Sequence, residues 1–256
     1  MFVPRPLREN ANLAFVGEPA WAPALLNNFQ AEGLLLAANP SGRPNADVLR
    51  QCQGWGKGQL RQRWQIDFPA HFTEAEVMLY TEPAAMLQQR LGSIKPGERW
   101  WAHPQPSATL RIAIARTDRY LCTQLRCPRT DPGVPWFWSD SSVVPDETLL
   151  VVARDEDFTH GLLQSREFRV WWEAHASEDQ PTLAFDCFPF PWSPRIPLGS
   201  LTALQQELRY NVARAARQED AEQIRQTVSL AYGFHASATD AEILQRLQTL
   251  NARRAY

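Results

Sequence analysis

Lysine is scarce in this sequence, which has only Lys57 and Lys95 among its 26 basic residues. A large class of nucleases places two carboxylates and a lysine around a metal ion, with the lysine two positions after an acidic residue. Here the residues two positions before Lys57 and Lys95 are Trp55 and Ser93, and neither is acidic. There is also no Gly-x-Ser-x-Gly elbow, His-Glu-x-x-His helix or phosphate-binding loop. The sequence therefore lacks several common hydrolase sites.

The few cysteines form no recognisable pattern. Cys52, Cys122, Cys127 and Cys187 include no Cys-x-x-Cys pair and no histidine lies at ligand spacing, so neither a zinc site nor a disulfide framework is indicated. The sequence also has no run of about 18 apolar residues, the length that a membrane span needs. We expect a cytosolic protein without a signal peptide or membrane segment.

A glycine-rich turn for S-adenosylmethionine is missing as well. The one candidate, "AFVGEP", has a single glycine, Gly17, followed by Glu and Pro, and no acidic residue ends a following strand at the expected distance. The acidic run "ARDEDF" at 153–158 could bind a metal, although a solvated turn is the commoner reason for such a cluster. We expect this chain to bind no cofactor and to have no enzymatic activity alone.

Charge is nearly balanced overall but is unevenly distributed. The formal net charge is −2, which argues against a uniformly basic protein that coats nucleic acid. Basic residues exceed acidic ones in segments 43–63 and 111–129, and acidic residues dominate 140–157. Arginine supplies most of the positive charge and can contact guanine edges and phosphates with its planar fork. A GC-rich genome also enriches arginine, so this bias alone does not decide the function.

The apolar pattern predicts a mixed α+β fold. Up to Asp67 the chain reads as strands or short helices joined by loops. Residues 73–91 predict a helix that begins with a Thr73–Glu76 capping box and kinks or ends near Pro83. From 111 to 153 the runs "RIAIA", "RYLCTQL", "VPWFWS" and "TLLVVA" predict a twisted antiparallel sheet.

The second half is predicted to become helical. Residues 158–176 have helical spacing and would place Ser165 and Arg166 in mid-helix. The proline-aromatic segment 187–197, "CFPFPWSPRIP", can form neither a helix nor a central strand, and we call it the strap. Beyond Ser200 we expect helices, the last capped by Thr239 and Glu242, with an apolar stripe. The stripe consists of Ile243, Leu244, Leu247 and Leu250. We predict a recognition domain at 1–195 and a helical region at 196–256.

The tetrapeptide Asn39–Gly42, "NPSG", poses a question because adenine methyltransferases use Asn-Pro-Pro-aromatic to hold a flipped base. Gly42 has no ring to stack on that base. Asn-Pro-Ser-Gly is also typical of a turn, since Pro fixes φ and Gly supplies a positive φ. We therefore predict a turn.

Several segments together resemble the C-terminal part of type IIL (MmeI-like) restriction-modification enzymes and related phage-defence DNA adenine methyltransferases. They occur in the same order and cover nearly the whole chain. The segments are "NPSGRPNADVLR", "WQIDF", "EAEVMLYTEP", "WWAHPQPSATLRIAI", "RYLCTQ", "VVPDETLLVVARDEDFTHGLLQSREFRVWW", "FDCFPFPWSP", "LTALQQEL" and "EILQRLQTLNARRA".

This resemblance implies a DNA target-recognition domain followed by C-terminal helices, without the catalytic half of those enzymes. It implies either an excised piece or a natural split, in which a separate methyltransferase catalytic subunit binds S-adenosylmethionine. The expected partners are therefore double-stranded DNA and that catalytic subunit, in a restriction-modification or phage-defence system. "NPSG" then corresponds to a turn of the recognition domain.

Base-reading candidates lie in the two basic segments, because Arg suits guanine, Asn suits adenine and Asp can accept from cytosine. For a single Arg, phosphate contact or a surface role is the more common outcome. Trp136 and Trp138 alternate on one strand and are expected to pack in the core. The candidates for DNA binding are Arg43, Asn45, Lys57, Arg61, Arg63, Arg126, Arg129 and Asp131.

The strap places Phe188, Phe190 and Trp192 at alternating positions, and their rings must be covered by this chain or by a partner. We predict that they dock the catalytic subunit, with packing against the chain's own helices as the alternative. Two other functions stay open. One is a protein-protein adaptor that uses the same fold without reading DNA, and the other is a small nuclease with an unfamiliar site.

Overall fold

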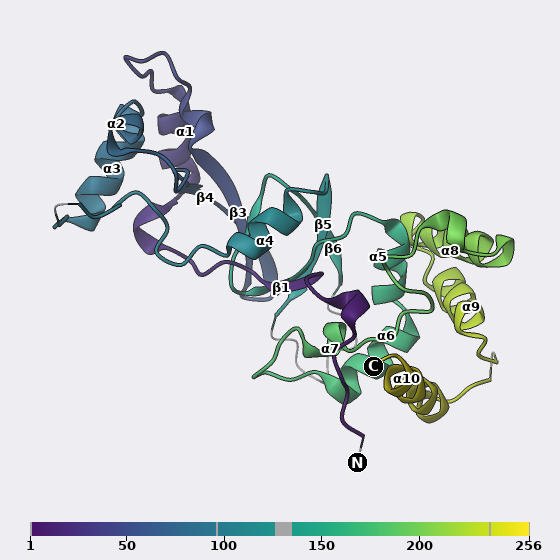
Figure 1. The fold of residues 1–256 in the computed structure, drawn as a ribbon. Helices are drawn as coiled ribbons and strands as arrows, with labels where there is room; N and C mark the ends of the chain where they lie inside the picture. The colour runs from purple at the N-terminus through teal and green to yellow at the C-terminus, as the bar shows by residue number, and fades with distance from the viewer. Residues whose placement is uncertain (1, 96, 126–134, 236, 256) are drawn as a thin grey trace. The chain divides into compact units, whose positions relative to one another are not determined.

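The computed structural model describes residues 2–95, 97–125, 135–235 and 237–255. The chain forms two compact units (Figure 1). The inserted unit consists of Gly17–Ala108 and Ser141–Leu149. The terminal unit consists of Met1–Val16, Thr109–Asp140 and Leu150–Tyr256.

A four-stranded sheet organises the described part of the inserted unit, with the order β2-β4-β3-β7. Strands β3 and β4 pair along their whole length as an antiparallel hairpin, whereas β2 pairs with only two residues of β4 and β7 runs parallel to β3. The strands are β2 (Leu25–Leu26), β3 (Leu49–Gly56), β4 (Gln59–Ile66) and β7 (Val144–Pro145).

The hairpin is closed by a two-residue turn at Lys57 and Gly58, whose φ angles are +55° and +77°. Positive φ at both central residues is the type I′ arrangement, which matches the right-handed twist of the paired strands. The two strands are therefore joined tightly, whereas the sequence pattern predicts strands or short helices in this region without indicating a hairpin.

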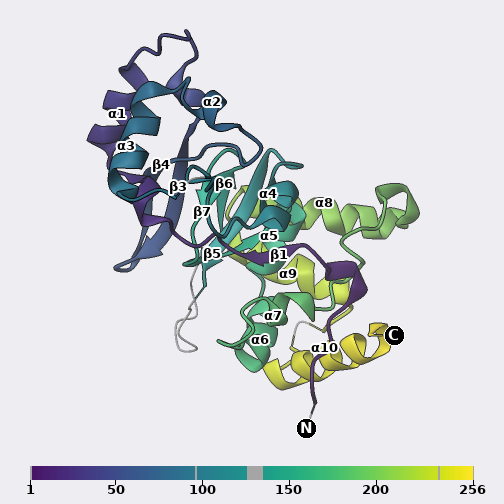
Figure 2. The ribbon, with the colours of Figure 1, turned by 60° about the vertical axis from the view of Figure 1, so that its left-hand side comes forward.

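Helices cover the base of this hairpin, and its distal half extends away from them (Figure 2). Leu49 and Ile66, at the base, belong to the same apolar core as Leu34 of α1 and Leu87 of α3. The helical elements of the inserted unit are η2 (Ala22–Ala24), α1 (Asn28–Leu36), η3 (Asn45–Asp47), α2 (Glu74–Val77) and α3 (Thr81–Leu91).

The helix predicted at 73–91 is divided into α2 and α3. The capping box is confirmed, since Thr73 accepts from the Glu76 backbone N–H and the Glu76 carboxylate accepts from the Thr73 backbone N–H. Pro83 lies in the first turn of α3, where its missing N–H costs little. The break therefore precedes the proline instead of following it.

The terminal unit contains a second sheet with the order β1-β8-β5-β6. Its antiparallel pairs β1–β8 and β5–β6 agree with the predicted strand-like runs. The prediction of a strand for "RIAIA" is wrong, because these residues lie in and just after helix α4. The Thr117 hydroxyl, which follows this helix, donates to the Ile114 carbonyl. The elements are β1 (Ala14–Val16), α4 (Ala108–Ile114), β5 (Arg119–Gln124), β6 (Phe137–Asp140) and β8 (Leu149–Val152).

Helices complete the terminal unit. Ser165 is not in mid-helix as predicted but caps α6, its hydroxyl accepting from the Phe168 backbone N–H. The last helix has the predicted Thr239–Glu242 capping box and buries Ile243 and Leu247. The elements are η1 (Arg8–Asn10), α5 (Asp157–Leu163), α6 (Arg166–His175), α7 (Leu183–Asp186), η4 (Leu198–Ser200), α8 (Ala203–Arg217), α9 (Ala221–Tyr232) and α10 (Asp240–Arg254).

The α+β class is confirmed by these two sheets and their helices. The compact units divide the chain differently from the predicted domains, since residues on both sides of position 195 share the terminal unit. Within the described residues, no helix has both the length and the apolarity to cross a membrane.

Candidate nucleic-acid interface

The β3–β4 hairpin has two faces with different compositions. Leu49, Gln51, Gln53 and Trp55 share one face with the residues they pair with across the ladder, because cross-strand partners point the same way. Arg50, Cys52, Gly54 and Gly56 form the opposite face together with Gln65, Arg63, Arg61 and Gln59, respectively. The second face is therefore basic.

The tip of the hairpin is strained at a charged residue. Lys57 is exposed and has a left-handed backbone, a conformation that costs a residue with a Cβ roughly 1–2 kcal/mol and that Asn or Gly adopts more easily. In the described part of the chain its ammonium group has no carboxylate partner. A cation is thus held at the tip although it is not the residue that the turn prefers.

Arg61 and Arg63 of β4 point to the basic face. The Arg61 guanidinium lies over Gly56, where a Cβ would overlap it, and its Nη2 donates to the Trp55 carbonyl at 3.0 Å. Arg63 lies opposite Cys52 and forms no ion pair with a described residue. Burial raises the pKa of the Cys52 thiol to about 12, so this thiol stays protonated at neutral pH.

The β3 edge of the hairpin is fixed by the segment that contains β7. The Asp146 carboxylate lies over Gly54, in the space that a Cβ would occupy, and accepts from the Thr148 backbone N–H at 2.9 Å. The Thr148 hydroxyl in turn accepts from the Trp55 backbone N–H at 2.6 Å. These contacts anchor one edge of the hairpin close to its tip.

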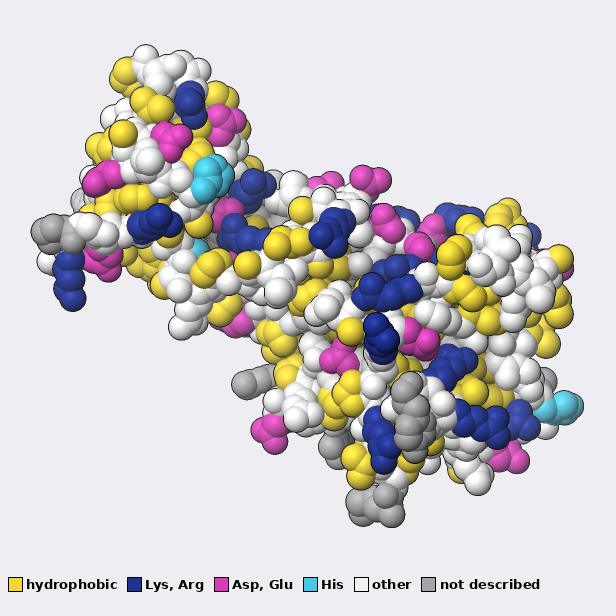
Figure 3. All heavy atoms as spheres, viewed as in Figure 1, with side chains coloured by type: hydrophobic (Ala, Val, Ile, Leu, Met, Phe, Trp, Pro, Cys, Tyr) yellow, Lys and Arg dark blue, Asp and Glu magenta, His cyan; other side chains and the backbone are white. Residues whose placement is uncertain are grey.

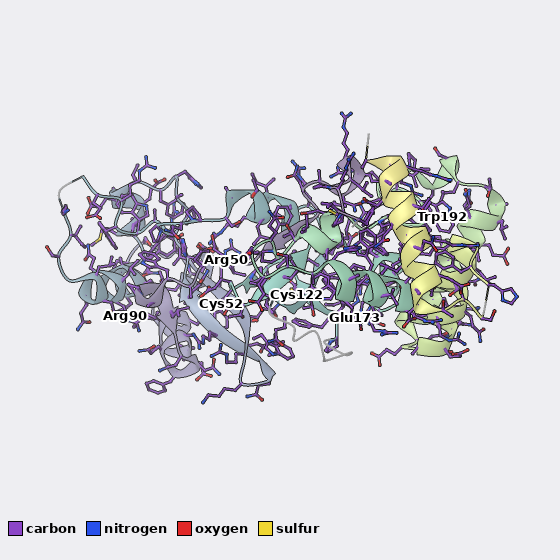
Figure 4. All side chains as sticks on the ribbon, turned by 90° about the horizontal axis from the view of Figure 1, so that it is seen from below. Arg50, Cys52, Arg90, Cys122, Glu173 and Trp192 are labelled. Carbon is purple, nitrogen blue, oxygen red and sulfur yellow. The ribbon has the colours of Figure 1, made fainter. Side chains whose placement is uncertain are left out.

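Arg50, which is visible on β3 beside Cys52 in Figure 4, was not among the predicted residues. Its Nε lies 3.1 Å from a carboxylate oxygen of Asp67, and 47% of its side chain is exposed. The ion pair engages Arg50, so the arginines of this face that form no ion pair with a described residue are Arg61 and Arg63. They line one hollow together with Glu18 and Asp146, so carboxylates share this face with them.

Three exposed amides on the hairpin were also missed. Gln51, Gln59 and Gln62 have no hydrogen-bond partner for their side chains among the described residues and face solvent. Their signal was present in the sequence, because "QCQGWGKGQLRQRW" has alternating polar residues on both sides of Lys-Gly. An amide can form a bidentate pair with adenine, so these residues have the chemistry of base readers.

The predicted turn at Asn39–Gly42 is confirmed. The Gly42 backbone N–H donates to the Asn39 carbonyl at 2.9 Å, and Gly42 has a φ of +74°. The Asn39 amide donates to the Arg43 carbonyl at 2.7 Å and to the Asn45 side-chain oxygen at 2.6 Å. This loop is a structural frame.

The position of Asn45 in this loop contradicts its predicted contact with DNA. Asn45 is 1% exposed, and its amide donates to the Leu34 and Ala37 carbonyls at the end of α1. Because its donors and its acceptor are used internally, Asn45 cannot read a base. Arg43 is exposed in the same loop, and a hydrogen bond to Tyr80 raises its pKa, which leaves Arg43 cationic and accessible.

Arg126, Arg129 and Asp131, the other predicted base readers, lie outside the described residues. The nearby tryptophans behave as expected for packing. Trp136 is buried, and Trp138 lies under the Arg119 guanidinium at 3.8 Å from its ring centroid.

The strap corrects the predicted docking face. Phe188 and Phe190 are 0% and 1% exposed, inside the core of the terminal unit. Phe188 packs at 5.0 Å on Phe168 of α6, between ring centroids, and the Phe190 carbonyl accepts from Arg254 of α10 at 2.5 Å. Since the chain's own helices cover these two rings, they are not available to a partner.

Trp192 is the partly exposed member of the strap (Figure 4). Its ring stacks on Phe158 of α5, with centroids 5.8 Å apart. Its docking role stays a prediction, although one face of the ring is already occupied.

The acidic run at 153–158 is neutralised by arginines. Asp157 pairs with Arg119 at 2.7 Å and with Arg217 at 2.8 Å. Glu156 pairs with Arg154 and Arg209, both at 2.7 Å. Across the described part of the chain, no group of three or more His, Cys, Asp or Glu residues could hold a metal ion.

Comparisons with known proteins identify a structural relative. No family model matches the sequence, and no curated protein matches it. A solved structure matches over 94% of this chain with a TM-score of 0.57 and 14% identity. It is the type IIL restriction-modification enzyme MmeI in complex with DNA, and the match covers 35% of that chain, so the present chain spans about a third of its length. The chain thus has a fold related to part of MmeI.

Proposed function

We propose that this chain is a non-catalytic DNA sequence-recognition component, which binds duplex DNA through the β3–β4 hairpin. The major groove of B-form DNA admits a two-stranded β-ribbon. The hairpin presents Lys57 at its tip, Arg61, Arg63 and Gln59 on one face, and the Gln62 amide on the opposite face. Arg contacts guanine and Gln contacts adenine, so the hairpin has the donors that a reader of base edges needs.

The observation that carries this proposal is the left-handed Lys57. Backbone strain that a simple substitution would relieve is a reason to look for a function. A lysine at the end of an anchored ribbon can reach a phosphate or a guanine. The fold relation to an enzyme solved with DNA supports the same proposal.

The proposed division of labour includes a second chain. A methyltransferase must locate its target before it flips a base, so a separate recognition module can position the duplex for catalysis. We propose that a catalytic methyltransferase subunit supplies S-adenosylmethionine and modifies adenine, in the cytosol, as part of bacterial restriction-modification or phage defence. The sequence of this chain has neither the glycine-rich turn nor Asn-Pro-Pro-aromatic, which supports a non-catalytic role.

A binding titration with fluorescent duplexes tests the proposal. The purified chain is titrated into a pool of random 30-base-pair duplexes, bound DNA is selected and sequenced, and the enriched duplex is used for variants. Lys57→Asn keeps the turn but removes the cation, and Arg63→Gln keeps a donor on the basic face. Both are expected to weaken binding, by roughly 1–3 kcal/mol for a residue that reads a base. Arg225→Ala removes a surface charge that is paired with Glu222 and is expected to change nothing.

The adaptor is the second candidate, and one observation favours it. Phe29 and Leu36 of α1 are 84% and 87% exposed. Seven residues apart, they lie on the same side of the helix two turns from each other, and Gly33 lies between them with open space around it. An exposed apolar stripe of this kind is typical of a protein-binding surface.

Paired substitutions separate the two candidates. Phe29→Ser with Leu36→Ser would abolish capture of a partner protein from the native operon if the chain is an adaptor, and DNA binding would be absent in the wild type. The DNA-recognition proposal instead predicts that this double variant binds the enriched duplex as tightly as the wild type does.

A further inference from the structure

The terminal unit has a second basic surface, far along the sequence from the hairpin. A solvent-open hollow of about 540 Å³ is lined by residues from both ends of the chain and from the strap. Figure 3 shows dark-blue basic side chains, which are arginines in this unit, gathered over the N-terminal segment and the end of α10. The lining residues are Arg8, Glu9, Ala11, Arg195 and Arg254.

Two of the three arginines are held in place by backbone carbonyls. Arg195 donates through Nε to the Glu9 carbonyl at 3.0 Å and through Nη2 to the Ala11 carbonyl. Arg254 donates to the Phe190 carbonyl at 2.5 Å and to the Pro191 carbonyl at 3.2 Å. These hydrogen bonds orient the guanidinium groups but cancel none of their charge.

The charge of the hollow is therefore only partly balanced. Glu9 is its one carboxylate and lies 3.3 Å from Arg254. Arg8 is exposed and has neither a carboxylate nor a hydrogen-bond acceptor for its guanidinium among the described residues. Arg195 keeps Nη1 for a further acceptor. Three guanidinium groups thus face one carboxylate. Arg195 and Arg254 also bind backbone carbonyls, and Arg195 still has an N–H donor free for a ligand.

We propose that this hollow binds a phosphate group of a nucleic-acid backbone, as a contact independent of base sequence. Guanidinium groups match phosphate oxygens in a bidentate geometry, and groups fixed in advance lose less entropy on binding. The hollow is open to solvent and four of its five lining residues are charged, whereas a small-molecule site is usually an enclosed cleft that covers most of its ligand. A polyanion that passes across the surface fits it better than an enclosed metabolite. The proposal rests on the proposed DNA-binding function and adds a second contact to it.

The test measures how duplex affinity depends on salt for the full chain. Arg8→Ala removes a guanidinium without an internal partner, and Arg195→Gln removes a charge while keeping a donor for the N-terminal segment. The matched control is Arg225→Ala on α9, and Lys57→Asn reports on the hairpin. Each variant is titrated with several duplex sequences between 50 and 200 mM NaCl, on the order of the range in which phosphate contacts dominate.

Arg8→Ala and Arg195→Gln are expected to weaken binding to every duplex by the same factor. The slope of the logarithm of affinity against the logarithm of salt should become shallower by about 0.9 for each phosphate that the variant no longer neutralises. The Arg225→Ala control should keep the wild-type slope. Equal melting temperatures for wild type and Arg195→Gln would show that the N-terminal segment is still in place.

Different results separate the two proposals. An unchanged affinity and slope for Arg8→Ala and Arg195→Gln, with weakened binding by Lys57→Asn, would overturn only the proposed phosphate contact at the hollow. The reverse pattern would support that contact and overturn the proposed DNA binding by the hairpin. If the wild type binds no duplex at any salt, or if only inorganic phosphate binds the hollow, the backbone contact is contradicted.

Discussion

The hairpin and the strap are both segments in which alternating side chains project from an extended backbone, yet their surroundings are opposite. In the strap, Phe188 and Phe190 are fully buried, and the carbonyl of Cys187 accepts from Asn251 of α10 at 2.7 Å. In the distal hairpin, Gln59 and Gln62 face solvent. Alternation of side chains along an extended segment therefore does not show whether they are buried or exposed to a partner. Burial depends on the helices that pack against the segment, and the C-terminal helices pack on the strap.

Truncating a strap ring should produce the largest effect on stability. Phe188→Ala would leave a cavity among Phe168, Trp171 and Phe190, whose rings contact it, and should lower the free energy of unfolding by about 3–5 kcal/mol. Urea denaturation measures this. Phe29→Ala, in which an exposed ring is removed, should change it by less than about 0.5 kcal/mol. Similar values for the two variants would show that the strap is not core.

A methyl group on the anchored edge of the hairpin should have the next largest effect. Gly54→Ala would drive its Cβ into the Asp146 carboxylate and disturb its contacts with Thr148, at a cost of roughly 1–3 kcal/mol. Gly33→Ala is the control, because nothing lies within 4 Å of its Cβ position in α1. Alanine should stabilise that helix by about 0.5–1 kcal/mol. A tolerated Gly54→Ala would show that the hairpin edge is loose.

The terminal unit, whose core contains the strap, also buries a carboxyl group, and we therefore expect its stability to depend on pH. Glu167 of α6 is fully buried, its Oε1 accepts from Ser229 at 2.5 Å and its Oε2 has no partner. Burial raises the pKa of Glu167 above its ordinary value of 4.5. As pH rises from about 4.5 through the folded-state pKa, the unfolded chain loses its proton first, so stability falls.

Glu167→Gln removes this ionisation and should flatten that part of the stability curve. The measurement is chemical denaturation of both proteins from pH 4.5 upward, a start set at about the ordinary pKa. The wild type should lose stability relative to the variant as pH increases. A wild type that gains stability over the same interval would mean that the carboxylate is ionised in the fold.

The smallest expected change is at the hairpin tip, and it has the opposite sign. Lys57→Asn should raise the free energy of unfolding by about 0.5–1 kcal/mol, because Asn tolerates the left-handed backbone better. The same variant is expected to bind DNA more weakly. A loss of stability in thermal denaturation would show that the tip is not strained, and would remove the observation that carries the DNA-binding proposal.

Much of the fold follows from local sequence signals. The Thr73 and Thr239 capping boxes form as expected because they need only residues three positions apart. "RIAIA" was assigned to a strand because branched apolar residues favour one, but in the protein it forms helix α4. A five-residue apolar run is too short for its periodicity to distinguish a helix from a strand.

The site was predictable only in part. Lys57, Arg61 and Arg63 were found from composition, and the structure places them on one hairpin. Asn45 was misassigned because its burial depends on Asn39 and on the end of α1. The strap was misassigned because its cover, including α10, is about 60 residues away in the sequence. Such long-range contacts leave no mark on the local pattern.

The central claim is that the hairpin lies against DNA, and photo-crosslinking tests it most directly. A benzoylphenylalanine is placed at Gln59 in one protein and at Phe29 in another, and each is irradiated with the enriched duplex. If the hairpin lies against DNA, a covalent DNA adduct forms from position 59 and none from position 29. An adduct from position 29, with none from position 59, would contradict it.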